Sequence, residues 1–183
     1  MRSLVLMSFL ALSSPALAEE PVCPPGPDHS ATIATLLDAL KEAPDQSEAR
    51  ALTNELWLLW TDAPDSRAQA LLDEGMAKRE SYDFLGARET FDLLVEYCPD
   101  YAEGYNQRAF ASFLRQDYPA ALWDLEKTLD LSPDHMAALS GLALTLMGLG
   151  RNDEAQEVLR RAVDMNPWLN ERHLLVEPEG TDI

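Results

Sequence analysis

The sequence predicts an all-α solenoid, a stack of similar helix pairs, and two observations lead to this prediction. Pro99, Pro133 and Pro167 follow one another at intervals of 34 residues. Before each proline, apolar residues recur at helical spacing. Self-similarity at a fixed period of this length is typical of repeat proteins, whose units bury their apolar faces by stacking.

The repeats also share columns of side chains of similar size. Counted back from each proline, two columns hold small residues and two hold large ones: Gly75, Ala109 and Ala143; Ala87, Ala121 and Ala155; Leu71, Tyr105 and Leu139; Phe91, Leu125 and Leu159. Small side chains let the two helices of a pair approach closely. We therefore expect three repeats within residues 67–167, at 68–101, 102–135 and 136–167.

Each repeat is predicted to contain two helices. Their expected ranges are 68–80 and 84–97, 102–115 and 118–131, and 136–149 and 152–165. Asp117 is placed to cap the helix that carries Pro119 in its first turn, where the missing N–H has no intrahelical partner. Asp100 and Glu103 have the spacing of a capping box.

This pattern closely resembles the tetratricopeptide repeat family. In the last repeat all eight motif columns fit: Leu139, Leu142, Ala143, Leu146, Ala155, Leu159, Ala162 and Pro167. The earlier repeats depart from the motif at Glu74, Lys78, Leu94, Arg108 and Ser112. The resemblance implies helix pairs that form a concave groove for a polypeptide partner.

The segments before the repeats have different expected roles. Residues 1–18 begin with one cation, continue through an apolar run and end in Ala-Leu-Ala, which is typical of a secretory signal cleaved after Ala18. We therefore expect a periplasmic protein with no stable membrane anchor. Residues 19–30 contain four prolines and predict a mobile arm.

Both ends of the array are expected to be capped. Residues 31–66 predict a degenerate helical hairpin whose Trp57 and Trp60 pack on the first full repeat. Residues 168–183 predict a capping helix followed by an acidic tail.

Cys23 and Cys98 are the two cysteines of the chain. In an oxidising compartment they could form a disulfide that ties the arm to the repeats, and the alternative is two unpaired thiols.

Charge and side-chain chemistry exclude several classes of function. The formal net charge of −18 leaves no electrostatic basis for nucleic-acid binding. His29, His135 and His173 lie in separate regions, so we expect no metal site, no cofactor and no catalytic site. A nucleophilic pair of Cys98 and His135 is discounted because their turns are one repeat apart.

The resemblance also implies which residues line the groove. The first helix of each repeat would direct eight of them inward: Leu72, Met76, Asn106, Phe110, Phe113, Ser140, Leu144 and Met147. The alternative is that neighbouring helices and the hairpin bury these side chains. Some relatives hold a carboxylate with Lys, Asn and Arg, and here the matching places carry Leu72, Met76, Gln107, Ala137 and Gly141, so we expect that clamp to be absent.

The functional hypothesis is a periplasmic scaffold or adaptor that binds a protein or peptide partner in the groove. Trp123 is expected on the outer face, where it either contacts a partner or has no role. Two alternatives remain: a self-associating structural component of the envelope, and a non-catalytic accessory of an envelope-biogenesis enzyme.

Overall fold

A computed structural model of the chain describes residues 22–176. The predicted signal sequence at 1–18 and the acidic tail at 177–183 lie outside this range.

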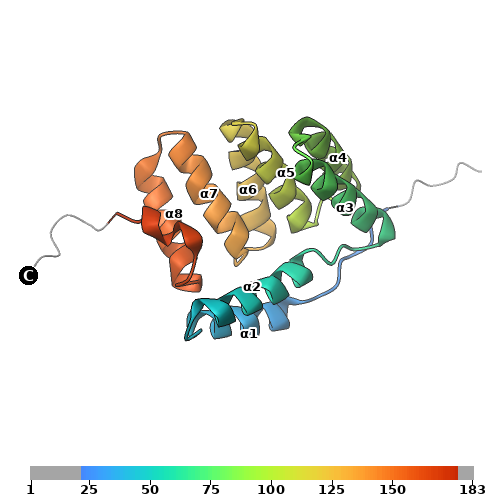
Figure 1. Ribbon diagram of the computed structural model, residues 1–183. Helices are drawn as coiled ribbons and strands as arrows, with labels where there is room; N and C mark the ends of the chain where they lie inside the picture. The colour runs from blue at the N-terminus through green and yellow to red at the C-terminus, as the bar shows by residue number, and fades with distance from the viewer. Residues whose placement is uncertain (1–21, 177–183) are drawn as a thin grey trace, which may run out of the picture.

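The described residues form eight α-helices and one short 3₁₀ helix, with no strand between residues 22 and 176 (Figure 1). In chain order they are α1 (Ser30–Lys41), α2 (Gln46–Trp60), α3 (Ser66–Glu80), α4 (Phe84–Tyr97), α5 (Ala102–Leu114), α6 (Tyr118–Leu131), α7 (Met136–Gly148), α8 (Asn152–Met165) and η1 (Asn170–Leu174). The α-solenoid predicted from the repeat pattern is therefore confirmed.

Aspartates define where several helices begin. Asp45 and Asp65 each accept hydrogen bonds from two backbone N–H groups of the following first turn. The predicted cap at Asp117 is confirmed, since its carboxylate accepts from the Ala120 N–H. The predicted capping box is wrong. Tyr101 precedes α5 without a side-chain cap, and the Glu103 side chain is buried in other contacts.

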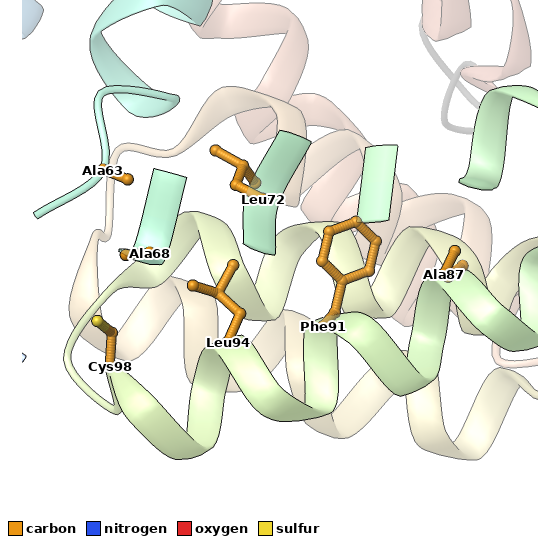
Figure 2. Packing of buried hydrophobic residues seen from close by; sticks show 8 residues of the cluster. Ala63, Ala68, Leu72, Ala87, Phe91, Leu94 and Cys98 are labelled. Atoms are coloured by element: carbon orange, nitrogen blue, oxygen red, sulfur yellow. The ribbon is translucent and has the colours of Figure 1, made fainter. Parts of the chain in front are cut away.

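The three helix pairs stack as the column pattern requires. α3 packs on α4, α5 on α6 and α7 on α8, while α4 contacts α5 and α6 contacts α7. In the first pair, Phe91 and Leu94 are fully buried against Leu72 (Figure 2). Gly75 lies against the Phe91 ring, so closely that a Cβ at this position would collide with the ring. The two helices of the pair therefore come closest at Gly75, in one of the columns of small residues.

The C-terminal edge of the array is covered by the segment after α8. Leu169, Leu174 and Leu175 pack on a core that includes Leu139 and Leu159. The capping helix predicted after residue 167 is reduced to the 3₁₀ turn η1. A short turn is sufficient because three leucines cover the exposed edge of α7 and α8.

The N-terminal hairpin of α1 and α2, here called the strap, does not stack on the first repeat. It lies across the ends of the repeats and reaches α8 (Figure 1). Trp60 stacks on His135 at the start of α7, with 4.2 Å between ring centroids, and the Trp168 Nε1 donates a hydrogen bond to the Ala43 carbonyl at 2.9 Å. The predicted packing of Trp60 on the first repeat is therefore wrong, because the apolar face of the strap is buried against Met136 and the end of α8.

Cys23 and Cys98 are joined in a disulfide, with 5.2 Å between their Cα atoms. The bond fixes the arm before α1 to the end of α4. Because α2 continues into α3, both ends of the strap are anchored at the first repeat, and its turn reaches the last repeat. None of the helices described between residues 22 and 176 has the length and apolarity needed to span a membrane.

Candidate functional site

The inner helices α3, α5 and α7 form a pocket of about 360 Å³ together with the strap and η1. Its apolar walls come from aromatic and aliphatic side chains, and its polar groups lie on α3, α5, α7 and η1. The residues that line it are Trp57, Arg79, Asn106, Gln107, Ala109, Phe110, Phe113, Leu125, Ala137, Ser140, Gly141, Leu144, Thr145 and Glu171.

Five of the eight residues that the resemblance placed in the groove line this pocket: Asn106, Phe110, Phe113, Ser140 and Leu144. The other three do not. Leu72 is fully buried between α3 and α4, so its assignment to the groove is wrong. Met76 and Met147 are half-buried and pack against the repeat cores, where a flexible side chain fills the space between helices.

The strap supplies one wall of the pocket. Trp57 of α2 faces the same space as Phe110 and Leu144, although the sequence placed it in the core of the first repeat. Phe110 remains 44% exposed, a high value for a large apolar side chain. The groove is thus bounded by the protein's own N-terminal hairpin and still presents an accessible aromatic surface.

Arg79 is the cation of this pocket, and the sequence analysis did not identify it. Its Nη1 donates a hydrogen bond to Gln107 Oε1 at 2.8 Å, and its guanidinium lies 4.7 Å from the centre of the Phe110 ring. Burial lowers the pKa of Arg79, and the nearby carboxylates of Glu80 and Glu103 oppose this effect. The guanidinium stays charged because its unperturbed pKa lies far above neutrality. No carboxylate between residues 22 and 176 forms an ion pair with it.

Gln107 is itself held by a buried carboxylate. Glu103 is 1% exposed and accepts hydrogen bonds from Gln107 Nε2, from Asn106 Nδ2 and from His135 Nε2, the last at 2.8 Å. Three donors therefore compensate a charge that would otherwise be costly to bury.

The tautomer of His135 follows from its second contact. The Ala138 N–H donates to His135 Nδ1 at 3.2 Å, so this nitrogen is the acceptor that caps α7. The proton of the neutral ring is then on Nε2, which donates to Glu103. Since Trp60 stacks on the same ring, one histidine connects the strap, the start of α7 and the polar side of the groove.

The outer face carries Trp123, which is 57% exposed as predicted for its position. Beneath it, Arg108 forms ion pairs with Asp92 at 2.9 Å and Asp124 at 2.6 Å. Burial raises the pKa of Asp124, while the hydrogen bonds from Arg108 oppose that shift. This cluster joins α4, α5 and α6 on the side opposite the pocket.

Reactive groups are not brought together in the described part of the chain. The Cys98 sulfur is in the disulfide, and His135 is committed to Glu103 and to the cap of α7. Among residues 22–176, no three side chains of His, Cys, Asp or Glu are grouped so that they could hold a metal ion.

Comparison with known proteins identifies relatives. A profile of the tetratricopeptide repeat family matches residues 112–167. A TPR repeat-containing protein of Rhizobium etli is 30% identical over 132 residues, which cover 72% of this chain and 65% of that protein. A tetratricopeptide repeat protein 36 homolog of Nematostella vectensis is 42% identical over 72 residues, which cover 39% of this chain and 40% of that protein. The chain thus spans less than two thirds of the length of both relatives.

Solved structures show the same fold. The first TPR of Spaghetti (RPAP3), bound to the HSP90 peptide SRMEEVD, is 20% identical, with a TM-score of 0.57 and coverage of 58% of this chain and 86% of that one. MamA is 20% identical, with a TM-score of 0.51 and coverage of 73% and 77%. The repeat columns, the stacked helix pairs and the profile match over residues 112–167 agree, and the chain carries repeats of the tetratricopeptide repeat family.

Proposed function

We propose that this protein is a periplasmic scaffold or adaptor that binds a polypeptide partner in the pocket between α5, α7 and the strap. The observation that carries the proposal is the pocket itself. Pockets with apolar walls and a few fixed polar groups are the usual form of a binding site. The fold is one that presents such surfaces for protein–protein interaction, and the absence of catalysis in this chain is part of the proposal.

The chemistry of the pocket defines what the partner has to present. Phe110, Phe113, Leu144 and Trp57 favour a large apolar side chain, such as one from an amphipathic helix. Asn106 and Ser140 offer hydrogen bonds to a peptide backbone. The net charge of −18 would steer neutral or basic partners towards the protein and affect the rate of association more than the affinity.

Proteins of similar fold support a peptide as the class of ligand. The structure of the first TPR of Spaghetti contains an HSP90 peptide, and a TPR2B domain of yeast Sti1 was solved in a complex with pHsp70. Their identities to this chain are 20% and 22%, so they support the use of the fold and not the identity of the partner.

Two features support export to the periplasm. Residues 1–18 have the pattern of a cleaved signal sequence. The disulfide between Cys23 and Cys98 suits an oxidising compartment, because thiols in the cytosol are kept reduced. Fractionation of cells that produce the full chain tests this part: the proposal expects a protein that starts at Glu19 in the periplasmic fraction, and an uncleaved protein in the cytosol contradicts it.

Binding is tested with a Phe110→Ala/Phe113→Ala variant. Wild-type protein captures partners from periplasmic extract, and each purified partner is then titrated against wild type and variant. Loss of two aromatic contacts at the centre of an interface should weaken binding at least about 10-fold.

The matched control is Trp123→Ala, which removes an exposed aromatic from the opposite face. Its affinity for the same partner should equal that of wild type. Unchanged affinity in the Phe110→Ala/Phe113→Ala variant, with helical content preserved by circular dichroism, would refute binding in the pocket.

A further inference from the structure

The outer edge of the first repeat is an apolar helix-pair face on which no further helix of residues 22–176 packs. At the other end of the array, Leu169, Leu174 and Leu175 cover the last repeat. The strap does not provide the equivalent cover for α3, because it lies across the ends of the repeats. An open hollow of about 690 Å³ remains at this edge.

This edge, here called the α3 edge, combines apolar and charged side chains. Residues of α3 and α4 form most of its lining, and Val22 of the arm and Pro99 after α4 complete it. The α3 and α4 residues are Arg67, Ala70, Leu71, Glu74, Leu93, Glu96 and Tyr97. Leu93 is 56% exposed, which is high for a leucine on a helix.

The second and third repeats show which element packs on the equivalent edge of a first helix. Ala70 corresponds to Gly104 and Ala138, and Leu71 to Tyr105 and Leu139, each 34 residues apart. The equivalents in the second and third repeats are buried, whereas Ala70 is exposed and Leu71 is half-exposed. A Cβ placed at Gly104 would be 3.3 Å from side-chain atoms of Leu94 and Val95, so the second helix of the preceding repeat covers that position. The α3 edge therefore has the shape of a helix-packing surface whose helix is missing.

The charges of α3 determine which helix fits. Arg67 lies three residues before Ala70, and Glu74 lies three residues after Leu71. If a second α3 packs antiparallel about a two-fold axis between Ala70 and Leu71, Arg67 of each copy faces Glu74 of the other. At the centre, the small Ala70 of one copy faces the larger Leu71 of the other. A two-fold interface requires this kind of self-complementary surface.

The present contacts of the two charged residues are weak enough to be exchanged. The Arg67 guanidinium lies 4.1 Å from the centre of the Tyr97 ring at the exposed edge, and Glu74 pairs with Lys78 at 2.7 Å within α3. A surface ion pair contributes between zero and about 1 kcal/mol, and an exposed cation–π contact contributes about 0.5–1 kcal/mol. They would not prevent new pairs with a second copy.

We propose that the α3 edge is a homodimer interface, in which two copies pack α3 against α3 about a two-fold axis and Arg67 of each pairs with Glu74 of the other. The surface is separate from the peptide pocket. A dimer of this kind leaves both pockets open and makes the scaffold bivalent, which increases its avidity for partners that carry two binding segments.

Charge reversal tests the pairing in the mature chain by sedimentation velocity. Wild type should be dimeric at about 100 µM, a concentration at which even a weak interface is populated. Arg67→Glu and Glu74→Arg should each weaken the dimer by at least about 10-fold, because each places two like-charge contacts in the interface. The combination of both changes should restore the dissociation constant of the dimer to within about 3-fold of wild type, since the ion pairs re-form with their charges exchanged.

The matched control is the reversal of an exposed pair on the far side of the array, Arg151→Glu with Glu154→Arg, which should leave the dimer unchanged. A monomeric wild type refutes the proposal, and so does a dimer that neither single reversal weakens. Failure of the double variant to restore the dimer, with wild-type helical content, also refutes the pairing. The Phe110→Ala/Phe113→Ala variant should still dimerise, so this proposal and the binding proposal can fail independently.

Discussion

Glu103 and His135 illustrate how strongly burial determines the contribution of a hydrogen-bonded pair to the stability of the protein. The Nε2–oxygen distance in this pair is 2.8 Å, and the two side chains are 1% and 0% exposed. His29 and Asp62 form a pair with the same 2.8 Å distance, but their side chains are 27% and 51% exposed. The distance is the same in both pairs, whereas burial and the further contacts of His135 differ.

Removing the buried imidazole should destabilise the protein more than removing the exposed one. His135→Ala takes one of three donors from Glu103 and removes the cap of α7, and we expect a loss of about 1–3 kcal/mol in the free energy of unfolding. His29→Ala should change it by less than about 1 kcal/mol. Urea unfolding of both variants measures the difference, and equal losses would contradict the role assigned to the buried pair.

The residues of the groove were only partly predictable from sequence. The resemblance to the tetratricopeptide repeat family placed Phe110, Phe113 and Leu144 on the inner face, and they line the pocket. It also placed Leu72 there, but the close approach of α3 and α4 at Gly75 buries that side chain. Arg79 and Glu103 were missed because their roles depend on partners 28 and 32 residues away, which no local pattern reveals.

At the scale of elements, the repeat helices were predictable and the strap was not. Within the repeats, aspartate caps mark the start of α3, α4 and α6, a proline follows the second helix of each pair, and columns of small residues mark the packing faces. The apolar faces of α1 and α2 do not indicate on which part of the repeats the strap packs. Leu40 and Leu56 pack equally well on any apolar surface, and their burial against Met136 is determined by the path of the chain from Cys23 to α3.

The disulfide should contribute measurably to the stability of the strap. It closes a loop with a sequence separation of 75 residues, and a bond of this kind stabilises by about 2–4 kcal/mol. Adding a reductant to wild type should lower the unfolding temperature and increase hydrogen exchange in α1 and α2.

The control for this experiment is Cys23→Ala, which removes the half-exposed partner of the bond. Its unfolding temperature should already be lowered and should not respond to reductant. A wild type whose stability is the same with and without reductant would show that the bond does not hold the strap.

At the scale of the molecule, the strap and the C-terminal segment convert an open array into a bounded site. The strap walls the pocket with Trp57, η1 contributes Glu171, and the repeats provide the aromatic floor. The uncovered α3 edge lies at the other end of the array from η1. The surface proposed for a partner and the surface proposed for a second copy therefore lie in separate parts of the molecule.

The most direct test of the account is site-specific photocrosslinking in intact cells. A photoreactive amino acid replaces Leu144 in the pocket in one strain and Trp123 on the outer face in another. We predict that the Leu144 position crosslinks to a defined polypeptide partner, that the Trp123 position does not, and that Phe110→Ala abolishes the crosslink. A crosslink to the same partner from Trp123, with none from Leu144, would contradict binding in the pocket.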